Sequence, residues 1–186
     1  MTILDNVSIV RGPNISLRLV QIPDAGYLYG LRINPDYNTH LSEFNGTLRD
    51  QEIWIEKYKE REAELKELYY IVERSDGVPC GAVRLYRISP PIFEWGSWIL
   101  DENKPKKAAL ESATLVYMTA FDIMGMDEAH FDVRRGNART LEFHRRYGAI
   151  ETHATEQDIY FKYPRSKFES DRDSFLSLLS GFRSDS

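Results

Sequence analysis

The sequence predicts an α/β protein built around one central sheet. Two observations support this prediction. Short apolar or alternating stretches typical of strands recur along the chain, and stretches with helical spacing stand between them. The 186 residues, 42% of them hydrophobic, suit one domain with its own core. We therefore expect a single α/β domain over residues 1–165, followed by a tail at 166–186.

The first half of the chain predicts a strand, two helices and a hairpin. A strand is expected at residues 15–20, where apolar and polar residues alternate. A helix then runs from about residue 23 to 34, where Pro35 ends it, and a second helix covers about 49–65. Strands at residues 68–73 and 78–88, joined by the turn Ser75-Asp76-Gly77, form the hairpin.

The second half alternates strands and helices. A strand at 92–100 leads to the longest helix, at about 106–124. The elements expected after it are a strand at 128–134, a helix at 137–147 that Gly148 closes, and strands at 149–153 and 158–163.

The tail carries apolar side chains among Ser and Asp, which predicts a short amphipathic helix. Two interpretations stay open: the helix packs on its own domain, or it contacts a second copy of the chain in a homodimer. The apolar residues are Phe168, Phe175, Leu176, Leu178, Leu179 and Phe182.

Charge and composition disfavour several classes of function. The net charge is −5 at pH 7, whereas proteins that bind duplex nucleic acid carry a basic excess. Cys80 is the single cysteine and has no disulfide partner within the chain. No signal peptide is recognisable, and no apolar run approaches the ~20 residues that span a bilayer. We expect a cytoplasmic protein with no membrane or nucleic-acid partner.

Motifs for nucleoside triphosphates and metals are not found. The patterns G-x-x-x-x-G-K-[ST], H-E-x-x-H and C-x-x-C do not occur. The four histidines lack the spacing of metal ligands. We therefore expect no metal site.

Lysines gather where the strand at 92–100 gives way to the long helix. Lys104, Lys106 and Lys107 lie there, and Pro105 suits a first helical turn. Free amides and the positive end of the helix dipole bind anions, and that end does not favour lysines. A polyanionic ligand explains the pattern, and a solvated basic loop is the alternative.

Arginines gather after the next strand, at Arg134, Arg135 and Arg139. If the strands at 92–100 and 128–134 are adjacent and parallel, both cationic junctions lie at one edge of the sheet. Two such junctions on an acidic chain indicate a phosphate-rich small ligand.

One face of the following helix holds three polar residues. Asn137, Thr140 and His144 share it, at relative positions 0, 3 and 7. Structural roles are the alternative: an Asn cap, a packed Thr and a half-buried His.

The stretch from Glu94 to Ala149 resembles the core of GCN5-related N-acetyltransferases (GNAT), in particular the branch that holds ribosomal-protein and nucleotide-amino-sugar N-acetyltransferases. In this family a bulged strand, here residues 95–100, precedes a pyrophosphate loop [QR]-x-x-G-x-[GA], here residues 104–109. The second pattern, N-x-x-[AS]-x-x-x-Y-x-x-x-G-F, falls on Asn137, Thr140, His144, Gly148 and Ala149.

The match departs from the family at four positions. Lys107 stands where the loop has Gly, and Lys104 where it has Gln or Arg. His144 stands where many members have a Tyr that acts as general acid, and Ala149 where Phe is common. The Lys107 side chain must either point outward or contact the phosphates directly.

The resemblance implies a single mixed sheet with splayed parallel strands, flanked by helices. It also implies direct transfer of an acetyl group from acetyl-CoA to a primary amine. The cofactor-binding residues would be Trp98, Ile99, Leu100, Lys104, Lys106, Lys107, Ala108, Ala109, Leu110, Asn137, Arg139 and Thr140.

For catalysis, the resemblance implies that Glu94 is the general base, through a water, and that His144 protonates the leaving thiolate. A surface carboxylate and a packing histidine are the alternatives. His130, which alternates with Asp132 on one strand face, is the reserve.

The acceptor side is expected on the first two helices and the loop between them, at Arg32, Asn34, Tyr37 and Trp54. Residues 31–36 resemble a Trp-Arg-Asn-x-Pro-Asp segment of amino-sugar N-acetyltransferases from bacterial surface-glycan pathways, which implies a nucleotide-linked amino sugar as acceptor. Two alternatives stay open. One is a GNAT for a protein N-terminus, a ribosomal protein or a polyamine, and the other is a non-catalytic CoA-binding domain of the same fold.

Overall fold

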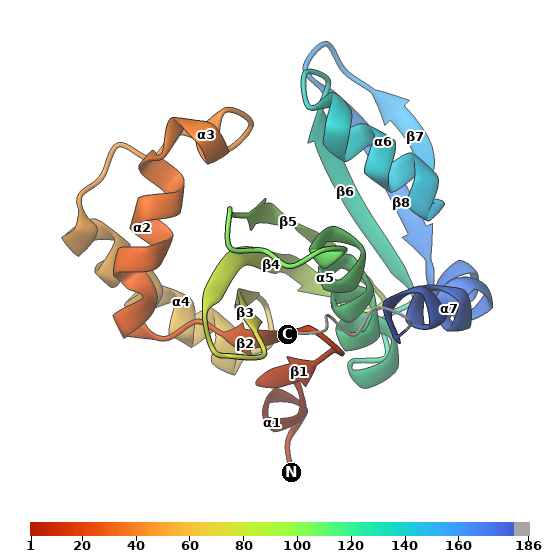
Figure 1. Cartoon of the computed structure of the whole chain (residues 1–186), viewed down its shortest axis with the longest axis horizontal. Helices are drawn as coiled ribbons and strands as arrows, with labels where there is room; N and C mark the ends of the chain where they lie inside the picture. Colours follow the sequence, from red (N-terminus) through yellow and green to blue (C-terminus); the bar gives the residue numbers. More distant parts are fainter. Residues whose placement is uncertain (181–186) are drawn as a thin grey trace.

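The computed structural model describes residues 1–180 of the chain, which form an open mixed sheet with helices on both faces (Figure 1). The described strands are β1 (Ile9–Arg11), β2 (Ile15–Leu19), β3 (Leu68–Arg74), β4 (Pro79–Ser89), β5 (Ile92–Leu100), β6 (Glu128–Arg134), β7 (Ile150–Ala154) and β8 (Asp158–Pro164). Their order across the sheet is β1-β2-β3-β4-β5-β6-β8-β7. Neighbouring strands are antiparallel, with the exception of the parallel pair β5 and β6.

The helices divide between the two faces of the sheet. One apolar cluster packs α2 and α4 against one face, and a second, larger cluster packs α5, α6 and α7 against the other. The described helices are α1 (Ile3–Val7), η1 (Ile22–Asp24, a 3-10 turn), α2 (Ala25–Ile33), α3 (Pro35–Asn38), α4 (Leu48–Ala63), α5 (Ala108–Tyr117), η2 (Met118–Ile123, a π-helical turn), α6 (Ala138–Tyr147) and α7 (Arg165–Ser180).

The predicted α/β class is confirmed, and so is the single mixed sheet flanked by helices. The structure adds three short elements, α1, β1 and α3, at places where the sequence shows little periodicity. Pro35 ends α2 as predicted, but it also begins α3, because Asn34 caps that turn by accepting the Asp36 amide at 2.9 Å.

The C-terminal tail forms α7, which packs on its own domain. Phe168 is fully buried, and Phe175 stacks on Tyr147 with 4.1 Å between the ring centroids. Leu179 is 1% exposed. Phe182, which the sequence places on the same apolar face, lies outside the described residues. None of the helices in the described part is long and apolar enough to cross a membrane.

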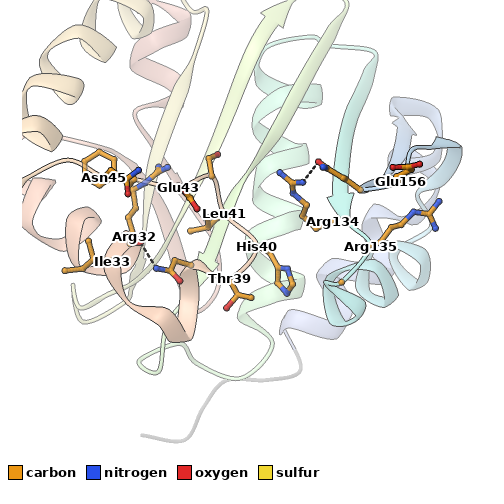
Figure 2. Close-up of a pocket in the computed structure, with 15 residues that line it drawn as sticks. Arg32, Ile33, Thr39, His40, Leu41, Glu43, Asn45, Arg134, Arg135 and Glu156 are labelled. Atoms are coloured by element: carbon orange, nitrogen blue, oxygen red, sulfur yellow. Dashed lines mark hydrogen bonds between the residues drawn. The ribbon is translucent and has the colours of Figure 1, made fainter.

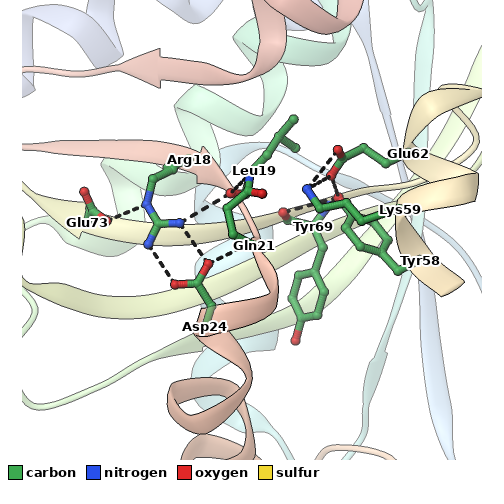
Figure 3. A network of polar contacts seen from close by, with 9 residues as sticks. All are labelled: Arg18, Leu19, Gln21, Asp24, Tyr58, Lys59, Glu62, Tyr69 and Glu73. Carbon is green, nitrogen blue, oxygen red and sulfur yellow. Dashed lines mark hydrogen bonds and ion pairs between the residues drawn. The ribbon is translucent and has the colours of Figure 1, made fainter. Parts of the chain in front are cut away.

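Two polar networks fasten α2 and α4 to the sheet (Figure 3). The Arg18 guanidinium on β2 donates to Glu73 on β3 at 2.6 Å and to Asp24, directly before α2, at 2.9 Å. On α4, the buried Tyr58 hydroxyl accepts the backbone N–H of Tyr69 on β3 at 2.7 Å and donates to Glu62. These side-chain contacts fix the positions of α2 and α4, which do not take part in the backbone hydrogen bonds of the sheet.

We expect Tyr58→Phe to lower the free energy of unfolding by about 1–3 kcal/mol, because the substitution removes the hydroxyl that accepts the buried Tyr69 N–H and leaves Glu62 with Lys59 alone. Urea denaturation followed by circular dichroism measures the change. Tyr29→Phe, on the same side of the sheet, is the matched control. An unchanged midpoint in Tyr58→Phe would show that water replaces the hydroxyl.

Candidate active site

The parallel strands β5 and β6 pair over three residues and then separate. The pairs are Ile92 with Glu128, Phe93 with Ala129, and Glu94 with His130. In Figure 1 the two strands diverge beyond this point, toward the upper edge of the view. From Trp95 onward, therefore, the β6-facing edge of β5 is free of sheet pairing.

A bulge in β5 lies directly after the separation. On β4, Ala82 and Arg84 pair with Ile99 and Gly96, so β5 carries one extra residue. Ser97 takes up this residue with a left-handed φ of 47°. The bulge directs Trp98 toward α5, where its indole N–H donates to the Ser112 hydroxyl at 3.1 Å.

The first turn of α5 begins at the predicted basic loop. Lys107 is the N-cap and has a φ of 61°, the left-handed conformation that glycine adopts most easily. Its ammonium group points outward and donates to the Leu178 carbonyl on α7 at 2.9 Å. Lys104 and Lys106 are exposed. The amides of the first turn, including Ala109 and Leu110, have no acceptor within the helix.

Two of the predicted arginines, Arg134 and Arg135, contact the turn between β7 and β8. Arg134 donates to the Gln157 side chain at 2.9 Å, and Arg135 to the Thr155 carbonyl at 2.7 Å. Asn137 caps α6, because its side chain accepts the Thr140 amide at 3.3 Å, and Arg139 is exposed on the same turn. The Asn-cap alternative therefore describes the geometry of this turn.

His144 lies in a cage of aromatic rings. It is 4% exposed, and the Phe131 ring is nearest, with centroids 4.3 Å apart. Burial lowers the pKa of His144 to about 3, which leaves the imidazole neutral at physiological pH. The other rings around it are Trp95, Trp98, Phe143 and Phe161.

The low pKa of His144 makes stability depend on pH. Below pH ~6.5 the unfolded chain takes up a proton at this residue and the folded chain does not, so the free energy of unfolding falls by up to ~1.4 kcal/mol per pH unit down to about pH 3. We expect His144→Phe to remove this part of the slope, as measured by urea denaturation between pH 4 and 7. His153→Phe, at an exposed position, is the control. Equal slopes in wild type and His144→Phe would contradict the burial.

Glu94 lies at the apex of the splay, on the face that α2 and α4 cover. Its carboxylate accepts from the Arg87 guanidinium at 2.9 Å. Tyr86 is its partner across β4 and His130 its partner across β6, so the three side chains share this face. The exposed Asp132 follows two residues after His130 on the same face.

A cleft of about 930 Å³ opens beside this face (Figure 2). The segment from Arg32 to Asn45 forms one wall, and the β6–α6 junction with Glu156 and Gln157 forms the other. His40 reaches across, since a Cβ on Gly136 would lie 3.5 Å from the imidazole carbon Cε1. The Arg32 guanidinium lies 5.5 Å from the centroid of the Phe44 ring.

The other predicted acceptor residues lie outside this cleft. Asn34 and Tyr37 line a smaller cavity of about 280 Å³ between α2 and the basic loop, where the Tyr37 hydroxyl accepts the Glu102 amide at 3.2 Å. Trp54 stacks on Tyr58, and the guanidinium groups of Arg61 and Arg84 lie 5.3 and 5.8 Å from its ring centroid. Of the four residues predicted for the acceptor, the structure brings Arg32 alone into the large cleft.

Several cleft residues were not predicted from the sequence as acceptor contacts: His40, Phe44, Arg134, Arg135 and Gln157. The basic cluster was visible, but its direction depends on the register of β6 and β8. Arg134 pairs with Asp158, which turns its side chain toward the acceptor face.

Comparisons with known proteins identify the family. The family described as acetyltransferase (GNAT) domain matches residues 14–150. The chain belongs to the GNAT acetyltransferase family. A structure of apo FdhC, described as a nucleotide-linked sugar GNAT, is 39% identical with a TM-score of 0.85, covering 92% of this chain and 98% of FdhC. No curated protein sequence matches the chain.

More distant GNAT structures share the fold. Spermidine N-acetyltransferase from Vibrio cholerae, in complex with CoA and spermine, is 17% identical with a TM-score of 0.73, and covers 85% of this chain and 99% of its own. A GCN5-related N-acetyltransferase from Brucella melitensis is 19% identical with a TM-score of 0.76, and covers 96% and 89% respectively.

Two features of this chain suit the binding of acetyl-CoA. The unpaired edge of β5 offers backbone groups to an amide-bearing arm, and the first turn of α5 offers amide donors to a pyrophosphate. Among residues 1–180, no group of three or more His, Cys, Asp or Glu side chains could hold a metal ion.

Proposed function

We propose that this GNAT protein transfers an acetyl group from acetyl-CoA to the amine of a nucleotide-linked amino sugar, in surface-glycan biosynthesis. The observation that carries the proposal is the large cleft beside the acceptor face, which is lined by Arg32, Arg134 and Arg135. The 39% identity to a nucleotide-linked sugar GNAT supports the same acceptor class.

The cleft offers the groups that a nucleoside diphosphate needs. Arg32, Arg134 and Arg135 line it, and guanidinium groups pair well with diphosphate oxygens. The Phe44 ring, which the Arg32 guanidinium approaches, provides an aromatic surface for a base. Such a ligand would extend from the arginines of the cleft with its amino sugar toward Glu94 and the splay.

On the cofactor side, the proposal assigns the diphosphate of acetyl-CoA to the first-turn amides of α5, at Ala108, Ala109 and Leu110. Lys104 and Lys106 add charge from the exposed loop, and Arg139 with Asn137 and Thr140 flanks it on α6. Trp98, Ile99 and Leu100 offer the backbone edge of β5. Lys107 contributes its backbone conformation, because its side chain is bound to α7.

Bound acetyl-CoA would supply an activated thioester, and residues of this chain would manage the protons. Glu94 is the first candidate for the base that deprotonates the amine. His144 is neutral in its cage, so we assign it a hydrogen bond to the leaving sulfur and leave the full proton to solvent.

We expect acetyl-CoA to bind with micromolar affinity and Lys106→Glu to weaken binding at least about tenfold, since it places a negative charge beside the anion site. Isothermal titration calorimetry of the wild type and of Lys106→Glu, with acetyl-CoA and with 3′-dephospho-CoA, measures the affinity and its loss. Lys57→Glu, on the exposed face of α4, is the matched charge reversal. A wild-type protein that does not bind acetyl-CoA would overturn the proposed function.

We expect turnover with a dTDP- or UDP-linked amino sugar and not with spermidine or a peptide N-terminus, as measured by release of free CoA thiol. Arg135→Ala and Arg32→Ala should each raise the KM for the sugar nucleotide about 10–100-fold, because each removes a charged partner of a phosphate. Arg146→Ala, on the outer face of α6, is the control. Turnover with spermidine and not with the sugar nucleotide would contradict the proposed acceptor and indicate a polyamine acetyltransferase. Binding of acetyl-CoA without turnover of any amine would favour a non-catalytic CoA-binding domain.

A further inference from the structure

The acceptor face carries a second carboxylate beyond Glu94, on the strand that leads away from the apex. Asp132 follows His130 by two residues, so it lies about 7 Å further along β6 on the same face. At Glu94 and His130 the strands β5 and β6 are still paired, whereas at Asp132 they have separated. Asp132 therefore stands at the mouth of the splay, while Glu94 stands at its closed end.

Tyr86 lies on the same face as the two carboxylates. A Cβ on Gly96 would lie 3.2 Å from the Tyr86 hydroxyl oxygen, so this hydroxyl covers the first unpaired residues of β5. The Arg84 guanidinium lies 4.8 Å from the centroid of the Tyr86 ring and makes a cation–π contact with it. Burial, together with the negative charges of Asp132 and Glu94, raises the pKa of Tyr86.

The two carboxylates differ in their partners. One oxygen of Glu94 is bound by Arg87, and the Glu94 side chain is 27% exposed. Asp132 is accessible to solvent although its surroundings desolvate part of the carboxylate, and ionisable groups on the neighbouring strands act on it. They are Tyr86 and Arg87 on β4, Glu94 on β5, Arg134 on β6 and Asp158 on β8, and Tyr160 on β8 is the cross-strand partner of Asp132.

We propose that Asp132 is a catalytic carboxylate of this site and takes the proton that the acceptor's ammonium group loses before attack. The proposal rests on the proposed function, since it needs an amine acceptor at the mouth of the splay. Partial burial and the negative charges of Asp158 and Glu94 raise the pKa of Asp132, which makes it a better proton acceptor than an ordinary aspartate. Glu94, held by Arg87, then contributes negative charge that attracts the ammonium ion.

The proton balance of the step is complete. One N–H proton passes from the ammonium to Asp132, and the neutral nitrogen uses its lone pair to form the bond to the acetyl carbon. The C–S bond breaks with its electron pair on sulfur. The nitrogen loses a second proton, the sulfur gains one through solvent, and the products are the amide and the free thiol.

The test compares Asp132→Asn, Asp132→Glu and Glu94→Gln, with Asp173→Asn on the exposed side of α7 as the matched loss of charge. In kcat/KM against pH, the wild type should lose activity as Asp132 takes up a proton, with an acidic limb above the usual range of an aspartate. Asp132→Asn should remove this limb and lower kcat about 10²–10³-fold, and Asp132→Glu should restore part of the rate. Hydroxylamine, which is neutral at the assay pH, should be acetylated with little loss in Asp132→Asn.

A readout without turnover accompanies the kinetics. Carboxyl ¹³C NMR of the free protein should show Asp132 titrating above the usual range of an aspartate, and Glu94→Gln should lower that midpoint. Isothermal titration of acetyl-CoA should be the same in Asp132→Asn and wild type. If Glu94→Gln removes the acidic limb and Asp132→Asn keeps it, the proposal is overturned and Glu94 is the base. If every amine fails although acetyl-CoA binds, the proposed function itself fails, and the role of Asp132 fails with it.

Discussion

The short parallel pairing between β5 and β6 is the constraint on which the rest of the structure depends. Parallel strands normally continue their hydrogen bonds to the end of the shorter strand, but here the pairing stops at Glu94 and His130. The divergence frees one edge of β5 and moves α6 away from α5. It also opens the face that carries Tyr86, Glu94 and Asp132, so a single change in strand geometry creates both the cofactor side and the acceptor side.

This geometry requires strained backbone, which neighbouring contacts hold in place. Ser97 and Lys107 both adopt left-handed φ angles, at a cost of about 1–2 kcal/mol per non-glycine residue. The hydrogen bond from Trp98 to Ser112 ties the bulge to α5, and Lys107 is tied to α7 through the Leu178 carbonyl. The terminal helix therefore supports the loop on which the proposed cofactor site depends, although it lies outside the matched family region at 14–150.

The sequence was sufficient to predict the long helices and strands, because burial of one face gives their apolar residues a period that can be counted. It was also sufficient for the bulged strand, which follows from the resemblance, and for the cap of α6 at Asn137, which was the structural alternative for that residue. It was not sufficient for side-chain direction. Arg134 turns to the acceptor face through its pairing with Asp158, and the pKa of His144 is low because an aromatic cage, with Phe131 nearest, buries the imidazole. Asp132 was within reach of sequence reasoning, since it shares a strand face with His130, but no motif marks it.

The distribution of charge argues for an acceptor with two opposite ends. Glu94 at the apex and Asp132 at the mouth make the splay negative. In the nearby cleft Arg32, Arg134 and Arg135 outnumber Glu43 and Glu156 and leave an excess of positive charge. A polyamine is attracted to the negative splay and repelled by the arginines of the cleft. A nucleotide-linked amino sugar carries an ammonium group that the splay attracts and a diphosphate that the arginines attract. Binding in the reverse direction would place like charges together at both ends. The same fields that attract such an acceptor thus orient its amine toward the freed edge of β5, and orientation is a large part of what a direct transfer requires.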